Sequence, residues 1–292
     1  MNSTATAPLV LGFDGSEGAD QALIWALDEA RARRLPVRIV HAYDGTYTYG
    51  SMAMYGNLPA ADTKLVRSAA KTILSRAEAD AAAYAPDVEV TTEAIDGDPA
   101  PTLLAQARGA ALVVVGSRRL HATGSILLGS VSTAVAARAS CPVVVVRGPA
   151  GDAAERARVV VAVDPREESQ EVLEFALEYA SRHGAPLRAV MCWHPDLLTE
   201  MVWSPKPPAP ARGEAWLSEA LAGWRERYPD VDVHGAVIRD HAVAGLVSES
   251  TAERLLVVGS RGRHALAGTL LGSVSQGVLH HATCPVAVVP LH

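Results

Sequence analysis

Long hydrophobic runs and basic charge are scarce in this chain of 292 residues, and each shortage excludes a class of protein. No stretch of 18 apolar residues occurs, and the start MNSTATAPLV lacks the basic and apolar parts of a signal peptide. We therefore expect a cytoplasmic protein without a membrane partner. The 32 acidic residues outnumber the 26 basic ones, and the net charge is −6. Because no basic stripe occurs, we do not expect a nucleic-acid partner.

Cysteine is also scarce, with Cys141, Cys192 and Cys284 as the three examples. Their spacing matches no metal-binding or redox motif, and each lies beside an apolar run. We interpret them as ordinary buried thiols. The adjacent pair His280 and His281 resembles a metal pair, but neighbouring side chains on a helix diverge by roughly 100°. We therefore assign no residue as a metal ligand.

What the chain does contain is a duplication of about 140 residues. The stretches GSRRLHATGSILLGSVS at 116–132 and GSRGRHALAGTLLGSVS at 259–275 share 11 of 17 residues without a gap. The same shift of 143 relates Cys141 to Cys284, and PLVLGFD near the start resembles RVVVAVD in the second half. Residues 147–158 have the polar composition of a linker. The sequence therefore predicts two domains, residues 1–150 and 151–292.

Each half alternates short Val/Ile/Leu runs with stretches of helical periodicity. In the first half, the apolar runs lie near residues 8–14, 37–43, 88–95, 111–116 and 142–147. The second half repeats this order from residue 158 to residue 290. Apolar strands that alternate with helices indicate a parallel sheet that is buried on both faces. We predict an α/β fold of two tandem doubly wound domains, each a five-stranded parallel sheet in the order 3-2-1-4-5 flanked by helices.

Two irregular stretches, residues 44–62 and 194–212, fall at the same place in the two halves. They are long for connections in an α/β domain. We interpret them either as flaps over a ligand or as surfaces for a protein partner.

A doubly wound sheet binds ligands beyond the carboxyl ends of its strands, where the strand order reverses. In the predicted order this point lies between the first and fourth strands. The loop after Asp14 then faces the loop after Gly116, and Asp164 faces the loop after Gly259. Loops of this kind between a strand and a helix are often only turns, but two copies with matching Gly, Ser and Arg positions favour a phosphate site.

The glycine-rich loops carry groups that suit an anion. In each half a Gly-Ser pair begins a predicted helix, where free N–H groups and the helix dipole favour negative charge. Neither loop contains the lysine of a Walker A motif, and GFDGSEG after the first strand is not a dinucleotide fingerprint. Hydroxyl donors and guanidinium counter-charges are available at Ser130, Ser132, Ser273, Ser275, Arg118 and Arg261.

These motifs resemble those of a known family. Gly259, Gly262, Gly272 and Ser273 form G-x2-G-x9-G-S, which resembles the ATP-binding motif of the universal stress protein family. LGFDGS at 11–16 resembles the signature of that family's first strand, and CPVVVV and CPVAVV resemble its last strand. The resemblance covers nearly the whole chain twice, so the chain is identified as a tandem universal stress protein of the actinobacterial type.

The resemblance implies one ATP site per domain, occupied by ATP alone or with Mg²⁺. It places Asp14 and Asp164 beside the ribose and any bound metal. Gly12 and Ala162 would pass close to the nucleotide, and the backbone of Ala42 and Cys192 would contact the adenine edge. It places the following residues along the ribose and phosphates: Gly116, Ser117, Arg118, Arg119, Gly129, Ser130, Val131, Ser132, Gly259, Ser260, Arg261, Gly262, Arg263, Gly272, Ser273, Val274 and Ser275. The family's last strands pair across a dimer, which implies an internal pseudo-dimer here, or a homodimer.

The two copies depart from the family pattern at different places. Arg119 stands where the second copy has Gly262, and Pro165 with Arg166 follows Asp164 where the first copy has Gly-Ser. We expect both sites to bind, with unequal affinity. Three roles for Arg119 are open: a side chain that points outward, an additional phosphate contact, or one that intrudes on the ribose pocket.

Three functions compete at this point. The first is an ATP-binding regulatory protein of the stress response, with little or no turnover and an unidentified protein partner. The second is a slow ATP hydrolase or nucleotidyl transferase, and the third is a scaffold with vestigial nucleotide sites. No general base, catalytic lysine or arginine finger can be assigned from the sequence, so we name no catalytic residue and favour the first function.

Overall fold

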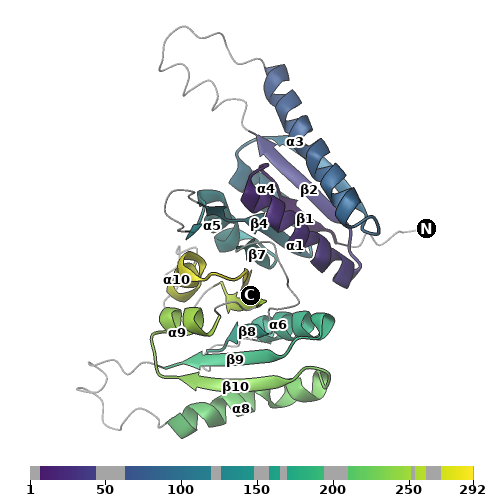
Figure 1. Cartoon of the computed structure of the whole chain (residues 1–292). Helices are drawn as coiled ribbons and strands as arrows, with labels where there is room; N and C mark the ends of the chain where they lie inside the picture. Colours follow the sequence, from purple (N-terminus) through teal and green to yellow (C-terminus); the bar gives the residue numbers. More distant parts are fainter. Residues whose placement is uncertain are drawn as a thin grey trace, which may run out of the picture. The chain divides into compact units, whose positions relative to one another are not determined.

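The computed structural model describes residues 7–43, 63–119, 126–147, 158–164, 170–193, 210–250, 254–260 and 271–291. The chain divides into a first unit, Met1–Ala150, and a second unit, Gly151–His292. In Figure 1 the first unit runs from purple to teal and the second from teal to yellow. No helix among these described ranges is both long enough and apolar enough to span a bilayer.

The described strands of the main sheet in the first unit run parallel to one another. They are β1 (Leu9–Gly12), β2 (Val37–Tyr43), β3 (Val90–Asp96), β4 (Leu112–Gly116) and β7 (Val143–Val146). β1 pairs with β2 and β4, β2 pairs with β3, and β4 pairs with β7. This confirms the predicted order 3-2-1-4-5. The side chains of β1, β4 and β7 are almost all buried, which explains why these strands read as unbroken apolar runs.

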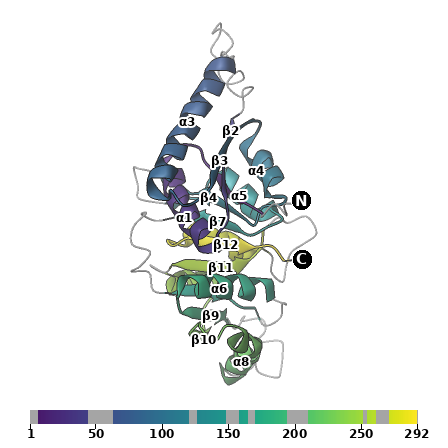
Figure 2. The ribbon, with the colours of Figure 1, turned by 90° about the vertical axis from the view of Figure 1, so that its right-hand side faces the viewer.

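Helices of the described residues cover this sheet on both faces. α1 (Glu17–Arg33) and α3 (Thr63–Tyr84) contact each other on one face, and α4 (Pro99–Ala107) and α5 (Ser130–Arg138) contact each other on the opposite face (Figure 2). The buried stripe of α1 consists mainly of alanine and leucine at helical spacing. The sheet is therefore covered on both faces, as a doubly wound fold requires.

The second unit repeats this architecture. Its strands are β8 (Val159–Ala162), β9 (Leu187–Cys192), β10 (Val233–Ile238), β11 (Leu255–Gly259) and β12 (Val286–Val289). β8 pairs with β9 and β11, β9 with β10, and β11 with β12, all in parallel. The helices are α6 (Gln170–His183), α8 (Pro210–Arg227), α9 (Ala242–Glu249) and α10 (Ser273–His281). The order 3-2-1-4-5 is therefore confirmed in this unit as well.

A short antiparallel pair after β4 was not predicted. β5 (Arg118–Arg119) pairs with β6 (Ile126–Leu127), so one two-residue ladder joins two separate parts of the first glycine-rich loop. Strands of this length carry no periodicity in the sequence, because alternation needs at least four residues to be recognised.

Several sequence predictions fall on other parts of the chain. The long stretch 44–62, the linker residues 148–157 and the residues Pro165 and Arg166 lie outside the described residues. The second long stretch was predicted to reach residue 212, but α8 begins at Pro210.

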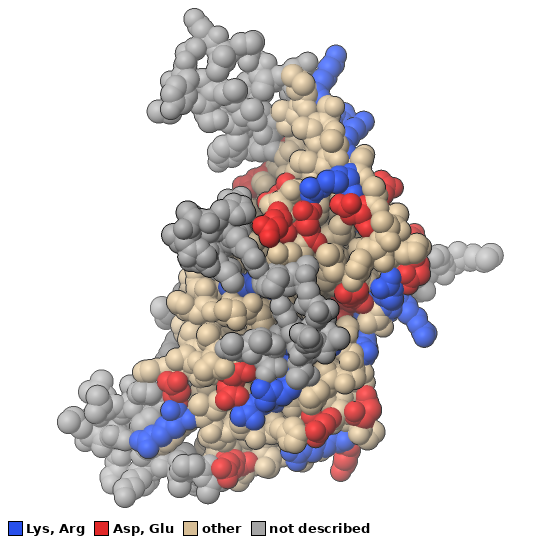
Figure 3. Space-filling model, viewed as in Figure 1, with Lys and Arg blue, Asp and Glu red and all other residues tan. Residues whose placement is uncertain are grey.

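Charged side chains of both signs intermingle on the surface that Figure 3 displays, and several form ion pairs between elements of one unit. Arg31 of α1 lies 2.7 Å from Asp87, and Arg188 of β9 lies 2.5 Å from Glu249 of α9. The Arg31 guanidinium also holds the pKa of the Asp87 carboxyl below its ordinary value. Exposed pairs of this kind contribute little stability individually, so the apolar core carries most of it.

Candidate functional site

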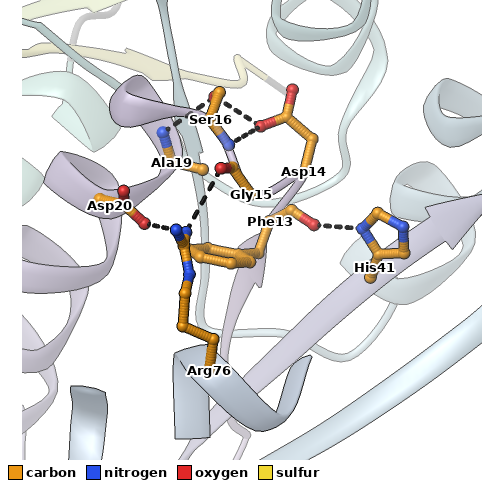
Figure 4. Close-up of polar contacts among 8 residues, drawn as sticks. All are labelled: Phe13, Asp14, Gly15, Ser16, Ala19, Asp20, His41 and Arg76. Atoms are coloured by element: carbon orange, nitrogen blue, oxygen red, sulfur yellow. Dashed lines mark hydrogen bonds and ion pairs between the residues drawn. The ribbon is translucent and has the colours of Figure 1, made fainter. Parts of the chain in front are cut away.

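The loop from β1 to α1 in the first unit, residues 13–16, is called the Asp loop here. Asp14 Oδ1 accepts hydrogen bonds from the Ser16 amide at 3.1 Å and from the Ser16 hydroxyl at 2.5 Å (Figure 4). Ser16 Oγ in turn accepts from the Ala19 amide and caps α1. Gly15 has a φ of +79°, a left-handed conformation that suits glycine. The loop therefore folds on itself and leaves Asp14 at the exposed edge of the sheet.

Two side chains from other elements hold the Asp loop in place. His41 of β2 has Nδ1 2.7 Å from the carbonyl oxygen of Phe13, to which the N–H form of that nitrogen donates. Arg76 of α3 reaches the same loop from its other side (Figure 4). Neither residue was singled out from the sequence, because each lies far along the chain from the loop it contacts.

The facing loop begins where β4 ends at Gly116. The Ser132 hydroxyl donates to the Gly116 carbonyl at 2.9 Å, and the Ser117 amide donates to the Val146 carbonyl at 3.1 Å. A Cβ atom on Gly116 would collide with the backbone of Gly18, and one on Gly18 would collide with the carbonyl of Ser117. The absence of a side chain at Gly116 therefore lets β4 approach α1 closely.

The N-terminus of α5 differs from those of its neighbours. α1 and α4 are capped by the side chains of Ser16 and Asp98, whereas no described side chain caps α5 at Gly129. The first amides of a helix have no partner within the helix, and here they belong to residues 130–132. An uncapped N-terminus of this kind suits an anion.

A cavity at the carboxyl edge of the first sheet brings these parts together. Nine of the predicted site residues line it: Gly12, Asp14, Ala42, Gly116, Ser117, Gly129, Ser130, Val131 and Ser132. For the predicted residues Arg118 and Arg119 the structure describes the backbone, which forms β5, but not the side chains. The lining also contains Phe13, Ser16, Ala19, Val40, Pro99, Leu103 and Val115, which were not predicted. In the sequence, apolar members of this group are indistinguishable from core residues.

The second unit repeats the pattern at its glycine-rich loop. The Ser275 hydroxyl donates to the Gly259 carbonyl at 2.6 Å, and the Gly272 amide donates to the Ser260 carbonyl at 2.9 Å. No described side chain caps α10 at Gly272, so the amides of residues 273–275 match those of α5. Three predicted site residues of this loop, Arg261, Gly262 and Arg263, lie outside the described residues.

The strand ends of the second unit differ in detail from those of the first. Ala162 ends β8, half-buried Asp164 follows it, and Cys192 ends β9. Cys192 Sγ lies 3.8 Å from the Ala242 carbonyl and occupies the space beside Gly245, where a Cβ would stand 2.8 Å from the sulfur. Burial raises the pKa of this thiol to about 11, with a smaller contribution from nearby carboxylates. The thiol therefore packs against α9 in its neutral form.

Within the described ranges, no group of three or more His, Cys, Asp or Glu side chains is arranged to hold a metal ion. Among the described residues that line the cavity in the first unit, Asp14 alone carries a carboxylate.

Comparison with known proteins shows the family of the chain. Residues 7–147 and 155–290 each match the sequence model of the universal stress protein family. The chain belongs to this family. A universal stress protein of Mycobacterium tuberculosis is 35% identical to it over 294 residues, which is 96% of each chain. As predicted from its motifs, this universal stress protein is therefore a tandem one, with a match to the family in each half.

Two solved structures are similar to this universal stress protein. The crystal structure of a universal stress protein from Archaeoglobus fulgidus covers 98% of this chain and 99% of its own, with 20% identity and a TM-score of 0.72. At that identity the likeness concerns the fold alone. A universal stress protein in complex with cAMP covers 49% of this chain and 98% of its own, with 26% identity and a TM-score of 0.36.

Proposed function

We propose that each unit of this universal stress protein binds ATP at the carboxyl edge of its sheet, between the first and fourth strands, and that binding regulates association with a protein partner. The observation that carries the proposal is the uncapped N-terminus of α5, which lines a cavity together with the Asp loop. α10 has the same uncapped N-terminus in the second unit.

The lining of the cavity combines the kinds of group that a nucleotide needs. The apolar side chains of Val40, Ala42 and Leu103 belong to it and suit the flat face of a base. The amides of residues 130–132 belong to it as well and suit phosphate oxygens. Asp14 adds a carboxylate, which suits ribose hydroxyls.

Mg²⁺ fits this site as a companion of the phosphates. Protein-bound Mg²⁺ is held by one or two carboxylates together with phosphate oxygens and water. Asp14 is exposed and supplies one such carboxylate in the first unit. When bound, the ion would neutralise phosphate charge beside Asp14.

Binding with little turnover is favoured over hydrolysis. Phosphoryl transfer needs a positioned nucleophile and cationic side chains that stabilise the transferred group. The described residues that line the first cavity include no lysine, arginine or histidine. Oδ1 of Asp14 already accepts two hydrogen bonds from Ser16, which restricts its use as a general base.

Calorimetric titration with ATP tests the proposal. The N-cap glycines Gly129 and Gly272 have φ values of −69° and −66°, which any residue adopts, so Gly129→Glu and Gly272→Glu place a carboxylate at the phosphate end without backbone strain. We expect two ATP molecules per wild-type chain, one for each single variant and none for the double variant.

Gly223→Glu is the matched control. Gly223 lies on α8, and a Cβ there would meet nothing within 4 Å, so this variant adds the same charge away from both sites. Wild-type chain that binds no ATP, or a double variant that still binds two molecules, would refute the proposal.

A further inference from the structure

Arg76 joins α3 to three residues at the start of α1 and the loop before it. Its Nη2 lies 2.6 Å from Asp20 Oδ1 and donates to the carbonyl of Gly15 at 3.3 Å (Figure 4). The guanidinium carbon also lies 5.7 Å from the ring centre of Phe13. One side chain thus combines an ion pair, a backbone hydrogen bond and a cation–π contact on the Asp loop and the first turn of α1.

α3 also packs directly against the loop. A Cβ atom on Gly15 would stand 3.3 Å from Cγ2 of Ile73, which lies one turn before Arg76. Ile73 and Arg76 therefore contact the same glycine, one by apolar packing and the other by a hydrogen bond to its carbonyl. The position of the Asp loop depends on the position of α3.

The corresponding helix of the second unit has a different residue at the position of Arg76. Equivalent hydrogen bonds end the two helices: the Ala85 amide donates to the Ala81 carbonyl in one, and the Tyr228 amide donates to the Trp224 carbonyl in the other. The shift of 143 between these pairs places Glu219 where the first unit has Arg76. A carboxylate cannot donate to a carbonyl or pair with an acid.

The strand contact to the Asp loop is also specific to the first unit. β2 pairs with β1 from Val37, and β9 pairs with β8 from Leu187, so His41 corresponds to Met191. Methionine has no N–H to donate to the preceding strand's carbonyl. At the positions equivalent to His41 and Arg76, the second unit therefore has side chains without an N–H donor.

We propose that Arg76 is a positioning residue of the first nucleotide site and that it holds the Asp loop in its binding geometry by tying it to α3. This inference rests on the function proposed above. Arg76 is not among the residues that line the described cavity, so it acts through Asp14 and its loop. Through this contact α3 controls the first site separately from the second.

The stability and the positioning roles of Arg76 are separable. The side chains of Arg76 and Asp20 are 48% and 43% exposed, and ion pairs in that environment contribute little to folding. A loop that is already ordered in its bound geometry, by contrast, has less freedom to lose when the ligand binds. Loss of Arg76 should therefore weaken binding while unfolding changes little.

The test uses the full chain with Gly272→Glu, so that only the first site binds ATP. In this background we expect Arg76→Ala to weaken ATP binding by about tenfold in calorimetry. Arg76→Lys should recover part of the loss, because lysine retains the charge that pairs with Asp20 but has one nitrogen in place of the guanidinium fork. Lys71→Ala, which removes a charge from an exposed position of the same helix, should have no effect.

A second measurement separates positioning from general structural support. If Arg76 acts through the Asp loop, Arg76→Ala should change affinity by less than about twofold once Asp14→Ala has removed the loop's own contact. A merely structural role would retain the full effect of Arg76→Ala in both backgrounds. Circular dichroism should show that the ligand-free Arg76→Ala chain unfolds within a few degrees of its parent.

The outcomes distinguish this inference from the function on which it rests. ATP binding that Arg76→Ala leaves within about twofold of the parent refutes the positioning role alone. A wild-type chain that binds no ATP refutes the proposed function and the positioning role with it. In the Gly129→Glu background, Glu219→Ala should leave the second site unchanged, and an equal loss there would also contradict the inference.

Discussion

At the scale of single residues, Ser132 and Ser275 have the same role in the two units. Each hydroxyl donates to the carbonyl of the glycine that ends the fourth strand, and both serines are buried. From the sequence we expected these hydroxyls to be phosphate donors. In the structure they instead fix the distance between the fourth strand and the helix that follows it, so that the helix amides are the groups left to meet an anion.

Ser132→Ala should lower the free energy of unfolding by about 1 kcal/mol, because the Gly116 carbonyl loses its buried partner. Urea unfolding followed by circular dichroism measures this change, and Ser275→Ala should give a loss of similar size. Ser68→Ala, on the exposed side of α3, is the control. Equal stability of the Ser132→Ala and control chains would show that the hydrogen bond contributes nothing.

Two cysteine thiols should react slowly in the folded chain. Burial raises the pKa of Cys141 and Cys192 from 9.0 to about 11, so at pH 8 the folded chain holds about a hundredfold less thiolate than the unfolded chain. Alkylation by iodoacetamide, followed by mass spectrometry, should therefore be slow without urea and fast with it. The rate in the folded chain should rise as pH increases toward 11. Rapid alkylation of Cys192 at pH 8 without urea would contradict its packing against α9.

At the scale of elements, two glycines let α1 and β4 approach each other. The backbones of Gly18 and Gly116 lie in direct contact. A methyl group on Gly116 would overlap the backbone of Gly18, and one on Gly18 would overlap the carbonyl of Ser117. This contact sets the separation of the Asp loop from the end of β4, across which the cavity opens. The spacing of two loops from different strands is therefore determined at a point where neither has a side chain.

Gly116→Ala should destabilise the chain by about 1–3 kcal/mol, because backbone cannot move aside as a side chain does. The control is Gly223→Ala on the exposed surface of α8, where a methyl group meets nothing and should instead stabilise the helix by about 1 kcal/mol. Urea unfolding of the two variants should give shifts of opposite sign. Shifts of the same sign would show that the glycine contact has room for a methyl group.

The elements themselves were largely predictable, because valine-rich strands buried on both faces leave unbroken runs in the sequence. The paired motifs also indicated the edge of the sheet that carries the cavity. The contacts between elements were not predictable. Arg76 lies 56 residues from Asp20, and an arginine on an exposed helix surface carries no sign of its partner. Val40 and Leu103 line the cavity, yet they read as core residues because their neighbours are equally apolar.

At the scale of the whole molecule, the two units share strand order and uncapped helix starts but differ at the two positions whose side chains hold the Asp loop of the first unit. His41 and Arg76 have Met191 and Glu219 as their counterparts. The sequence predicted unequal sites from Arg119 and Pro165. The described residues add a second reason to expect unequal sites, located on β2 and α3 of the first unit and not in the loops themselves.

Hydrogen exchange should report the two sites separately. ATP should slow amide exchange at the first turn of α5 and of α10 in the wild-type chain, because bound phosphate accepts from those amides. In the Gly129→Glu chain the protection should persist at α10 and vanish at α5. Mass spectrometry of peptic fragments resolves the two helices. Protection confined to other segments would mean that the nucleotide binds elsewhere.

The difference between Arg76 and Glu219 has a consequence for how the chain responds to its ligand. In a protein assembled from identical subunits, a substitution alters every copy of a site. In this chain, which carries the two copies in tandem, a substitution alters one copy and leaves the other unchanged. If both units bind ATP as proposed, and their affinities differ by about tenfold, the tighter site fills first and occupancy rises over a wider range of nucleotide concentration than at two identical sites. On that proposal, duplication makes the response to nucleotide more graded.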